Sequence, residues 1–210
     1  GVGSSGADAI RVVGFDPTDA LTAPHVDAYH FADGTVLSHA QLLARGFDFT
    51  GTAGDDIING TSIDDRFDGG AGNDLLKGGE GSDSYAWGVG AGTDVIDDGD
   101  TTSGATDRLQ VEAGLLATDL VLNRSGNDLV VHVRNGVDQV TVTNQFAGAG
   151  LEQIAFADGT TWNEADIASH LTNALTDGAD GYTGTSGPDV IDARGGNDTV
   201  HGAGGDDVID

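Results

Sequence analysis

The feature that most constrains this chain is a nine-residue repeat that opens with glycines and carries an aspartate at its sixth position. "GGAGNDLLK" (69–77) is followed at once by "GGEGSDSYA" (78–86). Glycine at positions 1, 2 and 4 allows positive φ angles and a sharp turn, whereas the last three residues can form a short strand. One such unit cannot bury an apolar face by itself, so the pattern predicts units that stack on one another.

The repeat keeps its frame through two blocks of the sequence. The first block holds units at 51–59, 60–68, 69–77 and 78–86, and a fifth that ends in "GTDVID" (92–97) after a two-residue insertion. The second block holds a degenerate unit at 175–183 and regular units at 184–192, 193–201 and 202–210. Position 8 is apolar throughout, which predicts one inward side chain per strand, at Ile58, Phe67, Leu76, Tyr85, Ile96, Tyr182, Ile191, Val200 and Ile209.

A coarser repeat surrounds the first block. "YHFADGTVL" (29–37) matches "IAFADGTTW" (154–162), and each is followed by a helix-like stretch. We interpret Asp33-Gly34 and Asp158-Gly159 as the corners of β-turns rather than as calcium ligands.

Two short helices are expected after these matching segments. Ser38 and Gln41 have the spacing of a capping box at the start of the first helix. Asn163 can cap the second helix. The apolar face of that second helix recurs at i, i+4 and i+8, on Ile167, Leu171 and Leu175.

The stretch between the two blocks reads as antiparallel β-structure. "DLVVHVR" (128–134) and "VDQVTVT" (137–143) both alternate apolar and polar residues, and Asn135-Gly136 between them is a strong hairpin signal. Alternation of this kind predicts one buried and one wet face. We therefore expect four segments: 1–50, the tail of a preceding spacer module with a short helix; 51–98, a first roll block; 99–175, an antiparallel β spacer ending in a helix; and 176–210, the start of a second roll block.

The charge of the chain restricts its partners. The sequence has 35 Asp and Glu against 8 Lys and Arg, a formal charge of −27. Such a chain repels nucleic acid and anionic membrane surfaces and attracts cations. It has no Cys, which excludes disulfides and thiolate zinc sites. No nucleophile, acid–base pair or catalytic metal motif stands out, so we expect no catalytic residues, no organic cofactor and no enzyme activity in this segment.

Calcium is the cation that these residues suit. Inward carbonyls and carboxylates, without His or Cys, are the hard oxygen ligands that Ca²⁺ prefers. Ordering nine backbone residues costs on the order of 9–18 kcal/mol, whereas one buried aliphatic side chain returns only about 1.5–3 kcal/mol. Stacking also brings rows of aspartates together at the strand spacing of about 4.8 Å. Ion binding is therefore expected to supply part of the folding free energy.

These units, Gly-Gly-X-Gly-X-Asp-X-apolar-X, resemble the RTX, or haemolysin-type calcium-binding, repeats of secreted bacterial proteins. The stretch with Asp107-Arg108-Leu109, "NDLVVHV" and "LEQIAFADGTTW" resembles the module often found between such repeat blocks. The resemblance implies an all-β fold of right-handed parallel β-roll blocks that flank an antiparallel spacer with one or two short helices. Two nonamers would form one coil.

The resemblance also implies that each Ca²⁺ lies between repeats n and n+2. The pairs would be Asp56 with Asp74, Asp65 with Asp83, Asp74 with Asp94, Asp180 with Asp198, and Asp189 with Asp207. Backbone carbonyls near Gly54, Gly72, Gly81, Gly187 and Gly205 would complete the coordination shells. Ile63 stands where the motif has glycine, which predicts a weaker site between Asp65 and Asp83. We expect about three to five ions.

Three functions remain open from the sequence. The first is a calcium-binding structural module of a secreted protein, exported unfolded by type I secretion as the resemblance implies, and folded by extracellular calcium. The second is the accessory C-terminal region of a secreted hydrolase, lyase or epimerase. The third is an adhesive, self-associating array with an extracellular polysaccharide or cell-surface partner. The sequence reads as a piece of a longer protein, and it contains no apolar run long enough to span a membrane.

Overall fold

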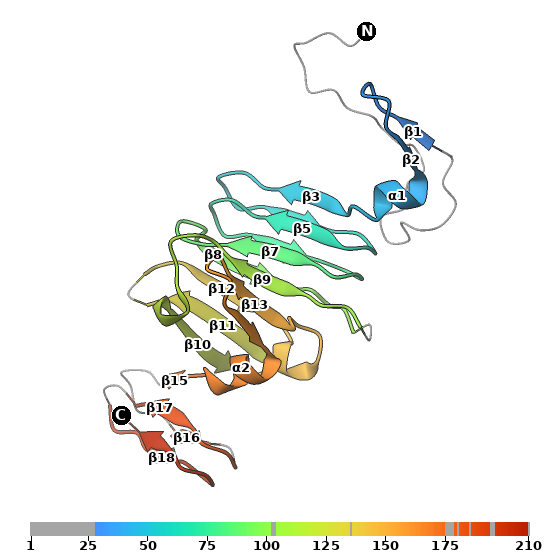
Figure 1. The fold of residues 1–210 in the computed structure, drawn as a ribbon. Coiled ribbons are helices and arrows are strands. Elements are labelled where there is room, and N and C mark those ends of the chain that lie inside the picture. Colours follow the sequence, from blue (N-terminus) through green and yellow to red (C-terminus); the bar gives the residue numbers. More distant parts are fainter. Residues whose placement is uncertain are drawn as a thin grey trace.

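Stacked strands form most of the molecule (Figure 1). The computed structural model describes residues 28–101, 104–134, 136–174, 179, 181–184, 186–193 and 196–209. Its helices are short, so the expected all-β class is confirmed. No helix in these ranges is long and apolar enough to cross a membrane.

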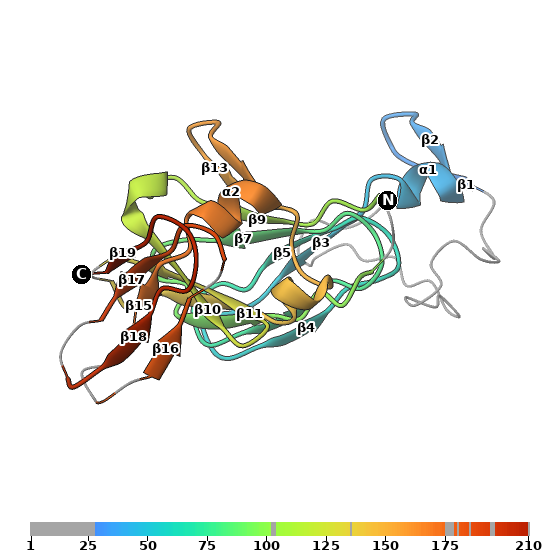
Figure 2. The same ribbon diagram turned by 90° about the horizontal axis from the view of Figure 1, so that it is seen from below.

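Successive nonamers place their strands in two facing sheets (Figure 2). The parallel strands of one sheet are β3 (Phe47–Thr50), β5 (Asp65–Asp68), β7 (Ser84–Trp87), β9 (Arg108–Val111) and β13 (Gln153–Phe156). Those of the other are β4 (Ile57–Asn59), β6 (Leu75–Lys77), β8 (Thr93–Ile96) and β12 (Gln139–Val142). Because consecutive repeats alternate between the sheets, two repeats make one coil, and the expected parallel β-roll is confirmed.

The position-8 side chains form the core between the sheets. Phe67 and Tyr85 are 2% and 0% exposed, and Leu76 and Ile96 are equally well buried. Equivalent residues of successive coils pair directly, so the ring of Phe67 stacks on that of Tyr85 at 5.0 Å between centroids. Phe49 continues the column at 5.3 Å from Phe67. One apolar side chain per strand is therefore enough, because each packs on its counterparts above and below.

The spacer continues both sheets of the roll. Strands β10 (Leu120–Ser125), β11 (Asp128–Val133) and β12 form the expected antiparallel meander, with Leu129 and Val131 buried against Val142 and Val140. Strand β12 then pairs in parallel with β8, and β13 pairs in parallel with β9. The 3₁₀ helices Ala117–Asp119 and Gln145–Ala147 connect these strands.

The two FADGT segments form the same hairpin-and-helix unit. Strands β1 (Ala28–His30) and β2 (Val36–Ser38) precede α1 (His39–Leu43), and β13 and β14 (Thr161–Asn163) precede α2 (Glu164–Ser169). Asp33 and Asp158 each accept a backbone N–H two residues ahead, at 2.8 Å in both turns, as the β-turn interpretation expects. The capping box of Ser38 with Gln41 and the cap by Asn163 are both present.

The second helix is shorter than the sequence pattern predicts. Helix α2 ends at Ser169, so the prediction that Leu171 lies on its apolar face is wrong. The backbone of Leu171 instead bridges to Leu122 in parallel, and the N–H of Thr172 donates to the carbonyl of Leu122 at 2.6 Å. The helix therefore ends where the backbone that follows it forms hydrogen bonds with the free edge of β10. Leu175 lies outside the described residues.

The second repeat block starts from this contact. Its strands β15 (Asn173–Ala174), β17 (Val190–Asp192) and β19 (Val208–Ile209) pair in parallel, as do β16 (Gly181–Thr183) and β18 (Thr199–His201). Ile191 is fully buried, whereas Ile209 on the outermost strand is largely exposed. The spacer thus lies between the two blocks (Figure 1): it pairs with the strands of the first block, and the carbonyl of Leu122 accepts the N–H of Thr172, directly before β15.

The aromatic column gives a direct test of this core. Replacement of Phe67 by Ala removes a ring stacked on both sides, and we expect the free energy of unfolding in saturating calcium to fall by about 3–5 kcal/mol. Ile57→Ala is the matched control, because Ile57 is 71% exposed on β4 in the facing sheet. Urea unfolding followed by circular dichroism measures both variants. Equal losses in the two would contradict the inward direction of position 8.

Candidate metal centre

The position-6 aspartates lie in columns along the edge of the roll. In Asp74, Asp83, Asp94 and Asp207, one carboxylate oxygen accepts the backbone N–H of the aspartate 18 or 20 residues earlier. Asp56 N–H donates to Asp74 Oδ1 at 2.9 Å, and Asp74 N–H donates in turn to Asp94 Oδ1 at 3.0 Å. The same contact joins Asp65 to Asp83 at 2.7 Å and Asp189 to Asp207 at 3.1 Å.

These contacts bring together four of the expected pairs: Asp56 with Asp74, Asp65 with Asp83, Asp74 with Asp94, and Asp189 with Asp207. The fifth, Asp180 with Asp198, cannot be placed because Asp180 lies outside the described residues. The contact between Asp65 and Asp83 is as short as the others, so Ile63 does not disturb the stacking of its coil. The association of each pair with an ion stays a prediction.

The position-4 glycines mark where one turn lies against the next. Gly72 and Gly205 have φ of +133° and +116°. A Cβ on Gly72 would lie 2.7 Å from the carbonyl carbon of Gly54, and one on Gly205 would lie 2.4 Å from that of Gly187. Gly81 has the same relation to Ile63, at 2.5 Å. Glycine is therefore required for close backbone approach as well as for its φ angle, and the turn carbonyls are stacked beside the carboxylates.

The residue at position 2 decides what the second carboxylate oxygen contacts. In the first two units this residue is threonine, and Thr52 and Thr61 donate both N–H and hydroxyl to the Oδ2 atoms of Asp56 and Asp65, at 2.6–2.8 Å. In the next two units it is glycine, which has no hydroxyl.

Asp74 and Asp83, in those next two units, have a different environment. They are 2% and 0% exposed, and the Oδ2 atom of each is buried without a hydrogen-bond partner. A buried carboxylate oxygen without a donor is energetically costly. Two inward carboxyl oxygens in the first block are therefore available to a ligand.

Burial also shifts the protonation of these columns. Desolvation raises the pKa of Asp83 to about 8 and that of Asp94 to about 6. Asp56, at the exposed first turn, has a lowered pKa because the N–H of Thr52 donates to it. A negative charge is therefore more costly on the buried Asp83 and Asp94 than on the exposed Asp56.

The carboxylate columns continue into the spacer, which the repeat frame did not predict. Asp107 Oδ1 accepts the N–H of Asp83 at 2.7 Å, and Glu152 Oε2 accepts the N–H of Asp107 at 2.6 Å. In the other sheet, Asp138 Oδ1 accepts the N–H of Gly92 at 3.0 Å. Asp107-Arg108-Leu109 and Asp138-Gln139-Val140 both repeat the Asp-X-apolar end of the nonamer, which is the signal that could have located them.

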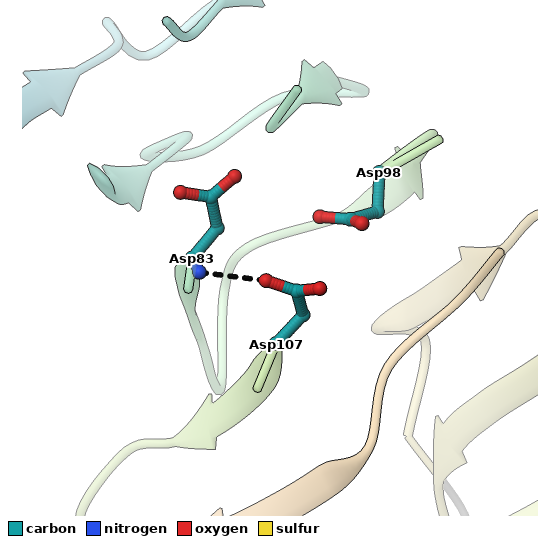
Figure 3. Close-up of side chains that lie close together, drawn as sticks. All are labelled: Asp83, Asp98 and Asp107. Atoms are coloured by element: carbon teal, nitrogen blue, oxygen red, sulfur yellow. Dashed lines mark hydrogen bonds between the residues drawn. The ribbon is translucent and has the colours of Figure 1, made fainter. Parts of the chain in front are cut away.

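Three of the buried carboxylates form a compact cluster (Figure 3). Oxygens of Asp83, Asp98 and Asp107 lie within 4.8 Å of one another, and this is the one group of three or more potential ligands in the described ranges. Tyr85 Oη donates to Asp98 Oδ1 at 2.6 Å. Burial raises the pKa of Tyr85, so the phenol keeps its proton, and it raises the pKa of Asp98 to about 6 and of Asp107 to about 8.

Comparison with known families agrees with this geometry. The RTX calcium-binding nonapeptide repeat family matches residues 50–85 and 176–209, and the haemolysin-type calcium binding protein related domain matches residues 128–166 between them. This chain carries RTX calcium-binding repeats. The recognition made from the Gly-Gly-X-Gly-X-Asp units is therefore confirmed, and with it the calcium-binding character of the repeats.

Two similar proteins are larger than this RTX chain. The iron-regulated protein FrpA of Neisseria meningitidis serogroup C is 30% identical over 101 residues, which are 46% of this chain and 9% of that protein. The crystal structure of the extracellular lipase LipA from Serratia marcescens matches with a TM-score of 0.41 and 18% identity, over 75% of this chain and 27% of LipA. Similarity at that level does not define the fold or activity of this chain.

The raised pKa values predict how the calcium-free chain responds to pH. A carboxyl group whose pKa is higher in the folded state stabilises that state when protonated, and this contribution is lost as the pH rises through the folded pKa. For Asp94 and Asp98 the loss falls near pH 6, and for Asp83 and Asp107 near pH 8. In excess chelator, the β-sheet circular dichroism signal should therefore be stronger at pH 5 than at pH 8.5.

A control variant and one contradicting outcome complete this test of the pH response. Asp158→Asn is the control, because Asp158 lies at an exposed turn and its pKa is lowered by the N–H of Thr160, so this variant should keep the wild-type pH response. A calcium-free chain that is more folded at pH 8.5 than at pH 5 would contradict the assigned pKa shifts.

Proposed function

We propose that this chain is a calcium-dependent structural module of a secreted protein, and that it folds when Ca²⁺ binds outside the cell. About three to five ions would bind between coils, at Asp56 with Asp74, Asp65 with Asp83, Asp74 with Asp94, and Asp189 with Asp207. Turn carbonyls near the position-4 glycines would complete the coordination. The nonapeptide family match supports calcium as the ion.

The observation that carries this proposal is the environment of Asp74. Its Oδ2 atom is buried and has no hydrogen-bond partner. Asp94 of the next coil is also buried, and its Oδ1 contacts the N–H of Asp74. The ligands available here are carboxylates and stacked carbonyls, which are the oxygen donors that Ca²⁺ accepts in flexible shells. The residues present therefore fit the ion that the repeat family binds.

The electrostatics explain why the ion would control folding. Two unit negative charges about 4.8 Å apart repel by about 3–4 kcal/mol at an effective dielectric constant near 20. Each added coil repeats this cost, and the net charge of −27 adds long-range repulsion. A divalent ion between two aspartates replaces that repulsion by attraction, so the free energy of binding becomes free energy of folding.

Secretion and the absence of catalysis are part of the same proposal. Extracellular calcium modules commonly bind with dissociation constants of about 10⁻⁴–10⁻³ M, which keeps such a module unfolded wherever calcium is scarce. FrpA and LipA, with which this chain shares similarity, are both much longer than the part matched. We therefore assign this chain a supporting role and place any enzyme activity of the whole protein outside it.

Calcium titration of the metal-stripped protein tests the proposal. Circular dichroism should change from a weakly structured to a β-rich spectrum, and isothermal calorimetry should detect binding of several ions per chain. Asp74→Asn should lower calcium-dependent stabilisation by about 2–3 kcal/mol for each of its two proposed sites that is lost, at a calcium concentration near 100 times the dissociation constant.

Asp206→Asn is the matched control for that variant. It removes the same charge from an exposed position-5 aspartate in the second block, so it should keep the wild-type titration. An unchanged spectrum and no heat of binding in the wild-type chain would refute the proposal. Equal effects of the two variants would refute the role of Asp74.

A further inference from the structure

Asp98 stands at a repeat position that holds glycine in the two preceding coils of the same sheet. In the repeat frame it stands at position 1, directly above Gly78 and Gly60 in the same sheet, because Leu76 pairs with Ile96 two residues earlier. Position 1 faces the interior of the roll. A Cβ on Gly78 would lie 2.0 Å from Tyr85 Oη, 2.2 Å from Asp83 Oδ2 and 2.6 Å from Asp98 Oδ1. Three oxygens therefore converge on the surface of Gly78.

The hydrogen bonds of the Asp83–Asp98–Asp107 cluster do not neutralise it. Asp83 Oδ1 and Asp107 Oδ1 each accept one backbone N–H, and Asp98 accepts the phenol of Tyr85 and the N–H of Asp100 at 3.2 Å. None of these donors is a charged side chain. Asp83 is 0% exposed, and its Oδ2 atom, which faces Asp98 across Gly78, has no partner. This buried carboxyl oxygen without a partner is the observation that points to a ligand.

The cluster has the dimensions and the access that a cation requires. Calcium binds oxygens at about 2.3–2.6 Å, so oxygens up to about 5 Å apart can share one ion, and those of the cluster lie within 4.8 Å. A cavity of about 520 Å³ borders it, lined by Gly78, Glu80, Asp98 and Asp100 among others. An ion can therefore reach Asp98 from an acidic cavity without passing through the apolar core.

We propose that Asp83, Asp98 and Asp107 bind one calcium ion at a junction site that the nonapeptide motif does not specify. The three residues belong to different parts of the chain: Asp83 precedes β7, Asp98 lies in the link after β8, and Asp107 precedes β9. An ion there would fix the last coil of the roll to the first strand that leads into the spacer. This inference rests on the proposed calcium-binding function and extends it to residues outside the repeat signature.

Counting bound ions in wild-type and variant chains tests the junction site. Asp98→Gly restores the residue that Gly60 and Gly78 have in the same column, so the roll can accommodate it, and Asp98→Asn keeps the side-chain volume. Native mass spectrometry at saturating calcium should detect one ion fewer for Asp98→Gly. For Asp98→Asn, the affinity of one site should fall at least tenfold. Asp97→Asn, one residue earlier and paired with Lys77 at the surface, should keep the wild-type count.

Terbium luminescence gives a second readout that a purely structural role would not change. Terbium replaces calcium in oxygen sites and is excited through a nearby tyrosine, and the phenol of Tyr85 touches Asp98. Emission excited through tyrosine should fall in Asp98→Gly, while circular dichroism in calcium stays that of the wild type. Asp74→Asn, in a different column, should retain this emission.

The outcomes separate the two proposals. If the wild-type chain binds several ions and Asp74→Asn binds fewer, but Asp98→Gly keeps the full count and the tyrosine-excited emission, the junction site is wrong and the repeat sites stand. That result would mean that Asp98 and Asp107 share a proton instead of an ion. If the wild-type chain binds no calcium, both proposals fail.

Discussion

The structure depends on one repeated contact, in which a carboxylate of each coil accepts the backbone N–H of the aspartate in the coil before it. This contact holds successive coils in register, as between Asp56 and Asp74 or between Asp65 and Asp83. It also forces like charges into a column at the edge of the roll. The hydrogen bonds use one oxygen of each carboxylate, and the charge that remains must be neutralised by protons or by cations.

The hydrogen-bond donors available to the second carboxyl oxygen differ from one unit to the next. Threonine at position 2 in the first two units supplies donors to the second oxygen of Asp56 and Asp65, which are the first position-6 aspartates of their columns. Glycine at position 2 in the next two units withdraws those donors where the coils are buried on both sides. The residue at position 2 therefore determines whether the second carboxyl oxygen is paired within its own unit or left available to an ion. The spacer continues one column through Asp107 and Glu152, whereas in the other sheet Asp138 accepts the N–H of Gly92, two residues before Asp94.

Much of the fold could be predicted from the sequence, because its signals are local and periodic. The fixed period of glycines and apolar residues predicted parallel coils, and the alternation in 128–134 predicted the antiparallel strands. The interaction of β12 with β8 and of β13 with β9 could not be predicted, because it depends on which free sheet edge is available. The early end of α2 has the same cause, since Leu171 bridges to Leu122 on the edge of β10.

The candidate site also contains some residues that could be predicted from the sequence and others that could not. The aspartates of the regular units were predicted because their spacing is fixed, and four of the expected pairs lie in contact. Asp107 was missed as a member of the column because an insertion after Asp98 breaks the frame, although the local Asp-Arg-Leu pattern is intact. Asp98 was missed because it replaces a glycine, and only the packing of Tyr85 and Gly78 brings it near Asp83.

The most direct test of the central claim is anomalous X-ray diffraction from crystals grown in calcium, recorded at a long wavelength. The account predicts anomalous peaks between stacked turns, with one beside the carboxylates of Asp74 and Asp94. Ordered coils in abundant calcium, with no anomalous peak between those two aspartates, would contradict the claim that divalent ions hold the roll together.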